Sequence, residues 1–378
     1  MSSSIAIIGV SGYAKSVFNS LCSVLNDSGA RLVAATVINR EEESATCSQI
    51  SKMGGTIFSD YREMLNSFCG KLDLVLVPTS IHWHAPIVLD ALKAGANVLV
   101  EKPLTGCLDE AQAVVDGAAS AGRFAAVAFQ DMYVPQTWEI KRFLVAGKLG
   151  RIRSVQLTGS WPRGRDYYFR NRWAGRLHCD GMPVFDSPLH NAFAHFINLA
   201  LFFAADEVNQ VEHVKSVKGQ LLRFFPIESF DTAAVSLLTS IGLPIHTILT
   251  YADSMWEDPR LVIQMEHGTL NWNLDSSVTA TNGNGRVVME WKLDPIEIKR
   301  QVMMRNVLHC VLNRELPLFP ADLALNQVEA VEKIHSALPI IDATAQRIEL
   351  GSDLNGTDPF ASVPGIFSLL RRNSSFPD

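Results

Sequence analysis

The chain has 378 residues, a formal net charge of −6 and 47% hydrophobic residues, which is typical of a globular protein with a large core. Its length predicts about two domains. It carries no block of basic residues and no apolar run near the ~20 residues of a membrane span, so nucleic acid and membrane are not expected partners. The start, MSSSIAIIGV, lacks the charged segment of a signal peptide, and the six cysteines form no CxxC pair. We therefore expect a cytoplasmic protein without a bound metal.

The first third of the chain alternates short apolar runs with segments of helical spacing. The runs that resemble buried strands are 4–10, 31–38, 73–78, 97–103 and 124–131. The segments with helical spacing are 14–25, 85–95 and 108–122. Continuous apolar strands separated by helices indicate a parallel sheet that is buried on both faces. The sequence therefore predicts a doubly wound α/β domain of the Rossmann type over residues 1–132.

The pattern changes after about residue 150, where strand-like segments such as TAAVSLLTSI and PIHTILTYAD follow one another. The segment TNGNGR, at 281–286, is a turn of the kind that joins antiparallel strands. Helices are expected over roughly 187–204, 296–313 and 321–338. Residues 133–378 are therefore predicted to form an α+β domain with an open, mostly antiparallel sheet.

A glycine-containing loop lies between the first expected strand and the first expected helix. It holds Gly9, Ser11, Gly12, Tyr13 and Ala14, where dinucleotide-binding proteins have G-x-G-x-x-G/A. Gly9 and Ala14 fit the first and third positions, whereas Ser11 brings a hydroxyl to the second. The start of the helix offers amide donors and a positive dipole end to a pyrophosphate. The loop is a candidate nucleotide site, and a tight turn without a ligand is the alternative.

The end of the second expected strand, TVINREEE, affects the choice between NAD and NADP. An acidic residue there would bind the ribose 2′-hydroxyl of NAD. Asn39 and Arg40 stand near this position, and a guanidinium suits the 2′-phosphate of NADP. The pair favours NADP, while Glu41 or Glu42 close by would restore a preference for NAD.

Three motifs follow one another in VPTSIHWHAPIVLDALKAGANVLVEKPLTGCLDEAQAVV. They are P-x-x-x-H at Pro78–His82, A-G at 94–95 and E-K-P at Glu101–Pro103. With this arrangement the chain resembles the glucose–fructose oxidoreductase/inositol dehydrogenase (Gfo/Idh/MocA) family, and the resemblance covers about residues 4–200.

The resemblance implies a first domain that binds NAD or NADP. It also implies a second domain whose sheet offers one face to the substrate and the other to a second copy of the chain. The implied reaction is oxidation or reduction of a carbinol carbon on a sugar, inositol or related polyol. Two other functions stay open. One is a redox-assisted glycosidase or lyase with a retained cofactor, and the other is a non-catalytic protein that senses nucleotide and sugar.

Lys102 is the candidate catalytic residue of the first domain. It follows a parallel strand at its carboxyl end, where open α/β sheets bind ligands. Its ammonium could bond a substrate hydroxyl and the ribose, and could stabilise a developing alkoxide. Glu101 would orient the amine or lie at the surface. Pro78, Thr79 and His82 are candidate cofactor contacts, although His82 could simply cap a helix.

The family's D-x-G-x-H signature corresponds here to DSPLH, from Asp186 to His190, with Pro in place of Gly. A histidine that titrates near neutrality can accept the hydroxyl proton. Asp186 would orient that imidazole, bind a substrate hydroxyl itself, or cap the expected helix. On a helix, His190 and His195 would point about 140° apart, so they cannot be equivalent. His190 is favoured as the proton acceptor over His195, and Phe193 stands where the family often has an aspartate.

A loop rich in arginine and aromatic residues, SWPRGRDYYFRNRWAG, spans 160–175. Aromatic faces and forked donors suit polyols, and several arginines would suit an acidic sugar. The candidate substrate contacts are Arg163, Tyr168, Arg172 and Trp173. The alternative is a loop that only packs.

Overall fold

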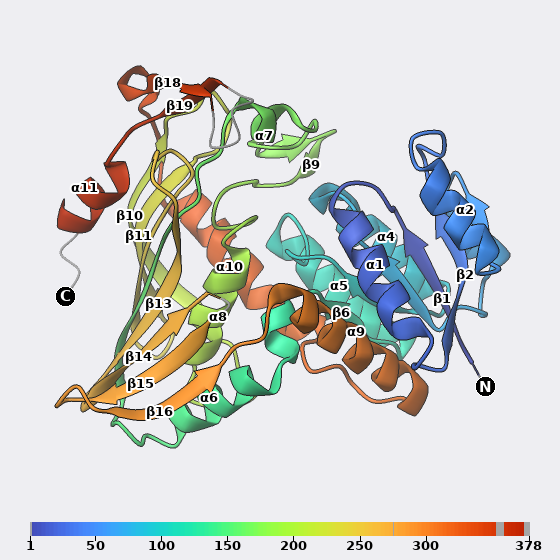
Figure 1. Ribbon diagram of the computed structural model, residues 1–378, viewed down its shortest axis with the longest axis horizontal. Helices are drawn as coiled ribbons and strands as arrows, with labels where there is room; N and C mark the ends of the chain where they lie inside the picture. Colours follow the sequence, from blue (N-terminus) through green and yellow to red (C-terminus); the bar gives the residue numbers. More distant parts are fainter. Residues whose placement is uncertain (1, 275, 353–358, 374–378) are drawn as a thin grey trace. The chain divides into compact units, whose positions relative to one another are not determined.

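The computed structural model describes residues 2–274, 276–352 and 359–373, which form two compact units (Figure 1). Unit 1 comprises Met1–Val134 and Pro295–Leu325. Unit 2 comprises Pro135–Asp294 and Asn326–Asp378. No helix within the described ranges is both long and apolar enough to cross a membrane.

Unit 1 is built on a parallel sheet that has six strands among the described residues. The strands are β1 (Ser3–Ile8), β2 (Ala30–Thr36), β3 (Thr56–Phe58), β4 (Leu74–Val77), β5 (Asn97–Val100) and β6 (Ala125–Val127). Their order is β3-β2-β1-β4-β5-β6, and each neighbouring pair is parallel. The order reverses between β1 and β4, which is where such sheets bind their ligands. The predicted doubly wound sheet is confirmed.

Helices cover this sheet. They are α1 (Tyr13–Leu25), α2 (Ser44–Lys52), α3 (Tyr61–Ser67), η1 (Ile81–Trp83), α4 (His84–Lys93), α5 (Leu108–Ala121), η2 (Gln130–Tyr133) and α9 (Ile296–Asn313). α1 is amphipathic, because the buried side chains of Ala14, Phe18 and Leu21 recur at helical spacing. α5 ends at Gly122, whose left-handed conformation suits glycine.

One segment differs from the division expected after residue 132. The chain returns to unit 1 at residue 295, and α9 packs against α1 and η2. In a buried pair, the Lys299 Nζ lies 2.8 Å from Asp131 Oδ1 of η2. The sequence indicated the helix correctly but gave no sign of the unit to which it belongs.

Unit 2 contains a mixed sheet with nine strands in its described part. Its strands are β7 (Ile152–Ser160), β10 (Val214–Arg223), β11 (Thr232–Thr239), β12 (Pro244–Thr250), β13 (Glu257–Met265), β14 (Gly268–Asn273), β15 (Ser277–Asn282), β16 (Val287–Lys292) and β17 (Ile340–Asp342). Their order is β16-β15-β14-β13-β7-β12-β11-β10-β17, and the pairs are antiparallel except β7–β12 and β10–β17. The expected turn joins β15 to β16, with Gly285 at φ 77°. The predicted open, mostly antiparallel sheet is confirmed.

The other elements of unit 2 lie outside this nine-stranded sheet. They are α6 (Pro135–Val145), α7 (Arg165–Phe169), β8 (His178–Cys179), β9 (Met182–Pro183), α8 (Ala194–Ala204), η3 (Thr344–Gln346), β18 (Ile348–Ser352), β19 (Pro359–Ser362) and α11 (Ile366–Asn373). α10 (Ala321–Ala337) begins in unit 1 and continues into unit 2. α8 is buried along nearly its whole length and packs on β7 and β13. The sequence did not indicate α6.

The helix expected over 187–204 is shorter than predicted. α8 starts at Ala194, and the residues before it form a series of turns in which Asn191 N donates to Ser187 O and Phe193 N donates to Pro188 O. Neither Asp186 nor Ser187 caps this helix, because its N-cap position is Phe193. The Asp186 side chain instead accepts hydrogen bonds from Gly175 N and from Asn191 Nδ2.

Candidate functional site

The glycine loop stands at the carboxyl end of β1. Gly9 and Gly12 have φ angles of 95° and 57°, which side-chain-bearing residues rarely adopt. A Cβ on Gly9 would lie 3.6 Å from Pro78 O and 3.9 Å from Thr79 Cγ2. α1 begins directly after Gly12 without a side-chain cap and without an acidic residue in its first turn. The positive end of this helix is therefore free to face an anion.

A chain of hydrogen bonds joins this loop to the end of β2. Ser11 Oγ donates to Asn39 Oδ1 at 2.9 Å, and Asn39 Nδ2 donates to Glu42 Oε2 at 2.9 Å. The guanidinium of Arg40 donates through Nη2 to Ile57 O at 3.0 Å. A carboxylate, Glu42, is thus tied to the glycine loop through one asparagine.

Thr79 provides a further polar group on the same rim. Its Oγ1 is buried and has no hydrogen-bond partner in the part of the chain that the structure describes. A buried hydroxyl without a partner costs free energy unless a ligand or water meets it. Together with the two glycines and the uncapped start of α1, it fits a dinucleotide, which Gly9, Gly12 and Thr79 would hold.

His84 connects two loops of this rim and was not ranked by sequence reasoning. Its Nδ1 lies 2.8 Å from Pro103 O, and its Nε2 lies 3.1 Å from Thr79 O. Burial lowers the pKa of His84 to about 4, and the charge of Lys102 lowers it as well, against the raising effect of the carbonyl contacts. The ring lies between the loop after β4 and the loop that carries Lys102. In its neutral form it has a single N–H, so it donates to one of these two carbonyls at a time. The only sequence signal was a second histidine two positions after His82.

Glu101 and Lys102 follow β5. Glu101 is buried, and its Oε2 accepts from Lys102 N at 3.2 Å. Burial raises the pKa of Glu101 to about 7, although the charges of Lys102 and Arg300 lower it. Arg300 of α9 also donates to the Tyr13 hydroxyl at 3.1 Å. The Lys102 side chain is half-buried, and His82 is buried.

In unit 2, Asp186 is buried, and both of its carboxylate oxygens accept hydrogen bonds from other residues of this unit. Its Oδ2 accepts from Gly175 N at 2.6 Å, and its Oδ1 accepts from Asn191 Nδ2 at 2.8 Å. These contacts hold the substrate loop predicted over 160–175 against the turns that precede α8. They replace the helix cap that the sequence suggested.

His190 and His195 have different surroundings. His190 lies in the turns before α8 and is fully buried, while His195 lies on α8 and is partly exposed. Gln327 Nε2 of α10 lies 3.4 Å from His190 Nδ1 and 3.2 Å from Leu189 O. The two histidines are not equivalent, but the reason is that α8 begins only at Ala194, after His190, and not the helical angle used to separate them.

An aromatic cluster surrounds Arg163. Its guanidinium carbon lies 5.0 to 5.9 Å from the centres of four rings, those of Trp161, Tyr167, Tyr251 and Trp256. Phe193 stacks on Trp161 with ring centres 4.7 Å apart. Phe193, which replaces the family's aspartate, is therefore a wall of this cluster.

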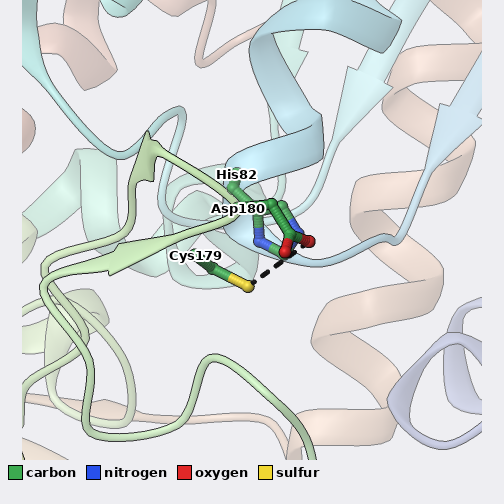
Figure 2. Close-up of side chains that lie close together, drawn as sticks. All are labelled: His82, Cys179 and Asp180. Carbon is green, nitrogen blue, oxygen red and sulfur yellow. Dashed lines mark hydrogen bonds between the residues drawn. The ribbon is translucent and has the colours of Figure 1, made fainter.

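The other candidate residues of the loop have protein partners. Arg172 Nη2 lies 2.7 Å from Asp180 Oδ1, and Tyr168 is buried and stacks on Phe225. The ring of Trp173 lies under the guanidinium of Arg170. Figure 2 shows the contact from Cys179 Sγ to Asp180 Oδ2, at 3.9 Å. Of the four residues predicted to contact the substrate, Arg163 differs in that its guanidinium lies among several aromatic rings.

The sequence matches two family models. Residues 3–129 match GFO_IDH_MocA, the oxidoreductase family with an NAD-binding Rossmann fold, and residues 137–271 match the GFO/IDH/MocA C-terminal domain. The chain is 27% identical over 186 residues to inositol 2-dehydrogenase of Rubrobacter xylanophilus, which covers 48% of this chain and 47% of that protein. It is 31% identical over 255 residues to inositol 2-dehydrogenase 4 of Saccharopolyspora erythraea, covering 67% of this chain and 68% of that protein.

The first of these matches spans about half the length of the relative. Among solved structures, the WlbA dehydrogenase from Bordetella pertussis, in complex with NADH and UDP-GlcNAcA, is 20% identical with a TM-score of 0.72. That similarity covers 89% of this chain and 96% of the other and bears on the fold. The two matching family models and the relative at 31% identity show that the chain belongs to the GFO/IDH/MocA family of oxidoreductases.

Proposed function

We propose that the chain is an NAD(P)-dependent oxidoreductase that acts on a carbinol carbon of a sugar, an inositol or a related polyol. The observation that carries this proposal is the loop from Gly9 to Ala14, with two glycines at positive φ and an uncapped helix behind it. Family membership and the names of the inositol 2-dehydrogenases support the reaction and the substrate class.

In the oxidative direction, the carbinol C–H bond breaks with its electron pair, the hydroxyl loses its proton, and a C=O bond forms. A bound nicotinamide would supply the hydride acceptor. We propose Lys102 and His190 as the residues that act on the reacting oxygen, because an amine and an imidazole can bond that oxygen and exchange its proton. We propose that Asp186, His195 and Arg163 bind the other hydroxyl groups of the substrate.

For the cofactor we propose NAD. Asn39 holds the Glu42 carboxylate through a 2.9 Å hydrogen bond and is itself bonded to Ser11. A carboxylate at this place would accept a ribose hydroxyl and repel a 2′-phosphate. The sequence favoured NADP through Asn39 and Arg40, but Arg40 already donates to Ile57 O.

We further propose that the chain forms a homo-oligomer through the sheet of unit 2. α8 packs on one face of this sheet. On β13, buried Leu261 and Ile263 alternate with the less buried Val262 and Gln264. The latter two lie in a groove of about 790 Å³ that also includes residues of β7, β12 and β14. A polar groove along an open sheet suits a second copy of the same sheet.

The test is a panel of sugars, inositols and polyols offered to the purified protein with NAD or NADP, with reduced nicotinamide followed by its absorbance. We expect turnover with at least one polyol and with NAD above NADP. Nucleotide binding without any turnover would replace the proposal with a sensing protein. Product formation with no net change in nicotinamide, and a nucleotide that stays bound through purification, would replace it with a redox-assisted glycosidase or lyase.

A further inference from the structure

Arg300 of α9 lies at the start of α1, the helix that follows the glycine loop. Its Nη2 donates to the Tyr13 hydroxyl at 3.1 Å, and its guanidinium carbon lies 5.2 Å from the centre of the Tyr13 ring. Tyr13 is the first residue of α1. The segment that returns to unit 1 at residue 295 therefore brings a cation to the glycine loop.

Neighbouring contacts fix the position of Arg300. α9 packs against α1 (Figure 1), and the preceding residue, Lys299, pairs with Asp131 in a buried contact of 2.8 Å. The Tyr13 hydroxyl holds the far end of the Arg300 side chain. Because the guanidinium is held at both its backbone and its tip, it loses little further conformational freedom when a ligand binds.

The contacts within the protein leave donors of this guanidinium unused. A guanidinium has five N–H donors, and the Tyr13 hydroxyl accepts from one of its nitrogens. The Arg300 Nε is buried and has no hydrogen-bond partner among the described residues. The side chain as a whole is only partly buried. The protein alone therefore does not satisfy the guanidinium, and part of the group is open to a ligand.

Glu101 is the acidic residue whose charge bears on Arg300. Burial raises the pKa of Glu101 to about 7, and the charges of Lys102 and Arg300 act against this rise. The Glu101 carboxylate accepts from Lys102 N, and among the described residues no hydrogen bond joins it to Arg300. A carboxyl group with this pKa is only partly ionised at neutral pH, so it neutralises the guanidinium only in part.

The start of α1 is open to an anion. The helix begins after Gly12 with no side-chain cap and no acidic residue in its first turn. A Cβ on Gly12 would have no atom of the described chain within 4 Å. The pyrophosphate of a dinucleotide binds at such a helix start, and arginine pairs well with phosphate oxygens through parallel hydrogen bonds.

We propose that Arg300 is a cofactor-binding residue whose guanidinium, positioned by Tyr13, binds the pyrophosphate of the nicotinamide dinucleotide. This role rests on the proposed function, which supplies the dinucleotide. The nucleotide site of unit 1 is then built from two segments far apart in the sequence, the glycine loop and the first turns of α9. The return of the chain to unit 1 thereby serves ligand binding as well as packing.

Calorimetric titration of the full chain with NAD and with ADP-ribose tests this contact. ADP-ribose has the pyrophosphate but no nicotinamide, so it separates the two ends of the cofactor. In Arg300→Met we expect the Kd of both ligands to rise about tenfold or more, because a charge-assisted hydrogen bond to phosphate is lost. The Kd should also depend less on salt, since one screened charge is absent.

Two further variants show that the loss comes from the guanidinium. Arg300→Lys keeps the charge without the planar fork, and it should recover part of the affinity. Arg305→Met, at an exposed position on the same helix, is the matched control and should bind both ligands like the native chain. Circular dichroism and the unfolding midpoint of each variant confirm that it is folded before titration.

A double variant separates binding of pyrophosphate from an effect transmitted through Glu101. Arg300→Met should weaken binding as much in a Glu101→Gln background as in the native chain. A loss that vanishes in that background overturns the proposal, as does an unchanged Kd in Arg300→Met. A loss confined to NAD overturns it too, because Arg300 would then act on the nicotinamide. The expected losses in a chain that turns over no polyol support the role of Arg300 and overturn the proposed function.

Discussion

Lys102 follows a buried strand, and two neighbouring side chains define its surroundings. Glu101 accepts a hydrogen bond from the Lys102 backbone, and His84 bonds the carbonyl of the next residue, Pro103. Both neighbours are buried. The lysine therefore leaves a loop whose backbone is held on both sides, which is the rigidity that a proton-handling group requires.

Replacing Lys102 with methionine should lower kcat/KM by about 100-fold or more, because the amine no longer stabilises the oxygen or takes its proton. The dissociation constant for NAD should change only a few-fold. Steady-state kinetics and calorimetric titration measure the two quantities. Lys93→Met, at the exposed end of α4, is the control and should retain native turnover. Native turnover in Lys102→Met would contradict the assignment.

Glu42 should decide the cofactor preference. In Glu42→Gln the charge that would repel a 2′-phosphate is lost, while the hydrogen bond to Asn39 can persist. We expect the ratio of kcat/KM for NAD to that for NADP to fall about tenfold, which corresponds to ~1.4 kcal/mol. Glu41→Gln removes a neighbouring exposed charge and should change the ratio little. An unchanged ratio in Glu42→Gln would remove the argument for NAD.

Buried polar contacts hold helices and turns of the fold, some between distant segments and some between residues a few positions apart. α9 is fastened to η2 by the pair of Lys299 and Asp131, whose side chains are 2% and 8% exposed. In unit 2, Asp231 precedes β11 and accepts from the backbone of Phe224 and Phe225 at 2.9 and 2.7 Å. Each of these contacts fixes the position of a segment that local propensity alone does not determine.

Lys299→Met should lower the free energy of unfolding by about 3 to 5 kcal/mol, because it leaves the Asp131 carboxylate buried without its ammonium. Urea unfolding followed by circular dichroism measures this loss. The double variant Asp131→Asn/Lys299→Met should recover part of it, since no buried charge remains. Lys15→Met, on the exposed face of α1, should be close to native. Equal losses in the single and double variants would show that packing, not charge, is responsible.

Asp231 should make stability depend on pH. Burial raises its pKa to about 7, against the lowering effect of its hydrogen bonds, whereas the unfolded value is near 3.8. Between these values the native state holds a proton that the unfolded state has lost, so the free energy of unfolding falls as pH rises from about 4 to 7. The loss would be at most about 4 kcal/mol.

Asp231→Asn tests this dependence, because an amide does not titrate. Urea unfolding of both proteins at several pH values gives the difference in free energy, in which the other carboxyl groups cancel. We expect the variant to gain stability relative to the native chain as pH rises through this window. A difference that stays constant with pH would show that Asp231 is ionised throughout.

On the face of the unit 2 sheet opposite to α8, α11 packs against β12, next to a groove along the strands. Val262 of β13 pairs with Gln156 of β7, and both line the groove of about 790 Å³. Neither side chain is fully buried, and both belong to central strands. A twofold dimer joins the same surface of both copies, and we propose that this groove is part of that surface.

Val262→Glu should shift the chain toward the monomer. A carboxylate at a twofold contact is repelled by the same carboxylate of the second copy, and burying it in the interface costs desolvation free energy. Sedimentation velocity over a range of concentrations measures the assembly. Val287→Glu, on the edge strand β16 and 51% exposed, is the matched control on the same sheet. A monomeric native chain, or a dimer unaffected by Val262→Glu, would contradict the proposed interface.

The sequence by itself determined the elements and the local signals of the site. Apolar runs predicted strands at the places of β1, β2, β4, β5 and β6 in unit 1 and of β11 and β12 in unit 2, but not β3, β10 or β17. Helical spacing predicted the ends of α5, α9 and α10 to within a residue or two. The loop at Gly9 and the motif ending at Lys102 were found because each consists of neighbouring residues. Periodicity and turn chemistry act over a few residues, so they can be seen in one sequence.

Only the tertiary structure decided which distant segments meet. It returned α9 to unit 1, delayed the start of the helix expected over 187–204 to Ala194, and placed His84 between two loops. It also brought Gln327 to His190, 137 positions away in the chain. Such contacts are made by the packing of whole elements, and no spacing within a single sequence records them. For that reason the sequence could name His190 but could not show what surrounds it.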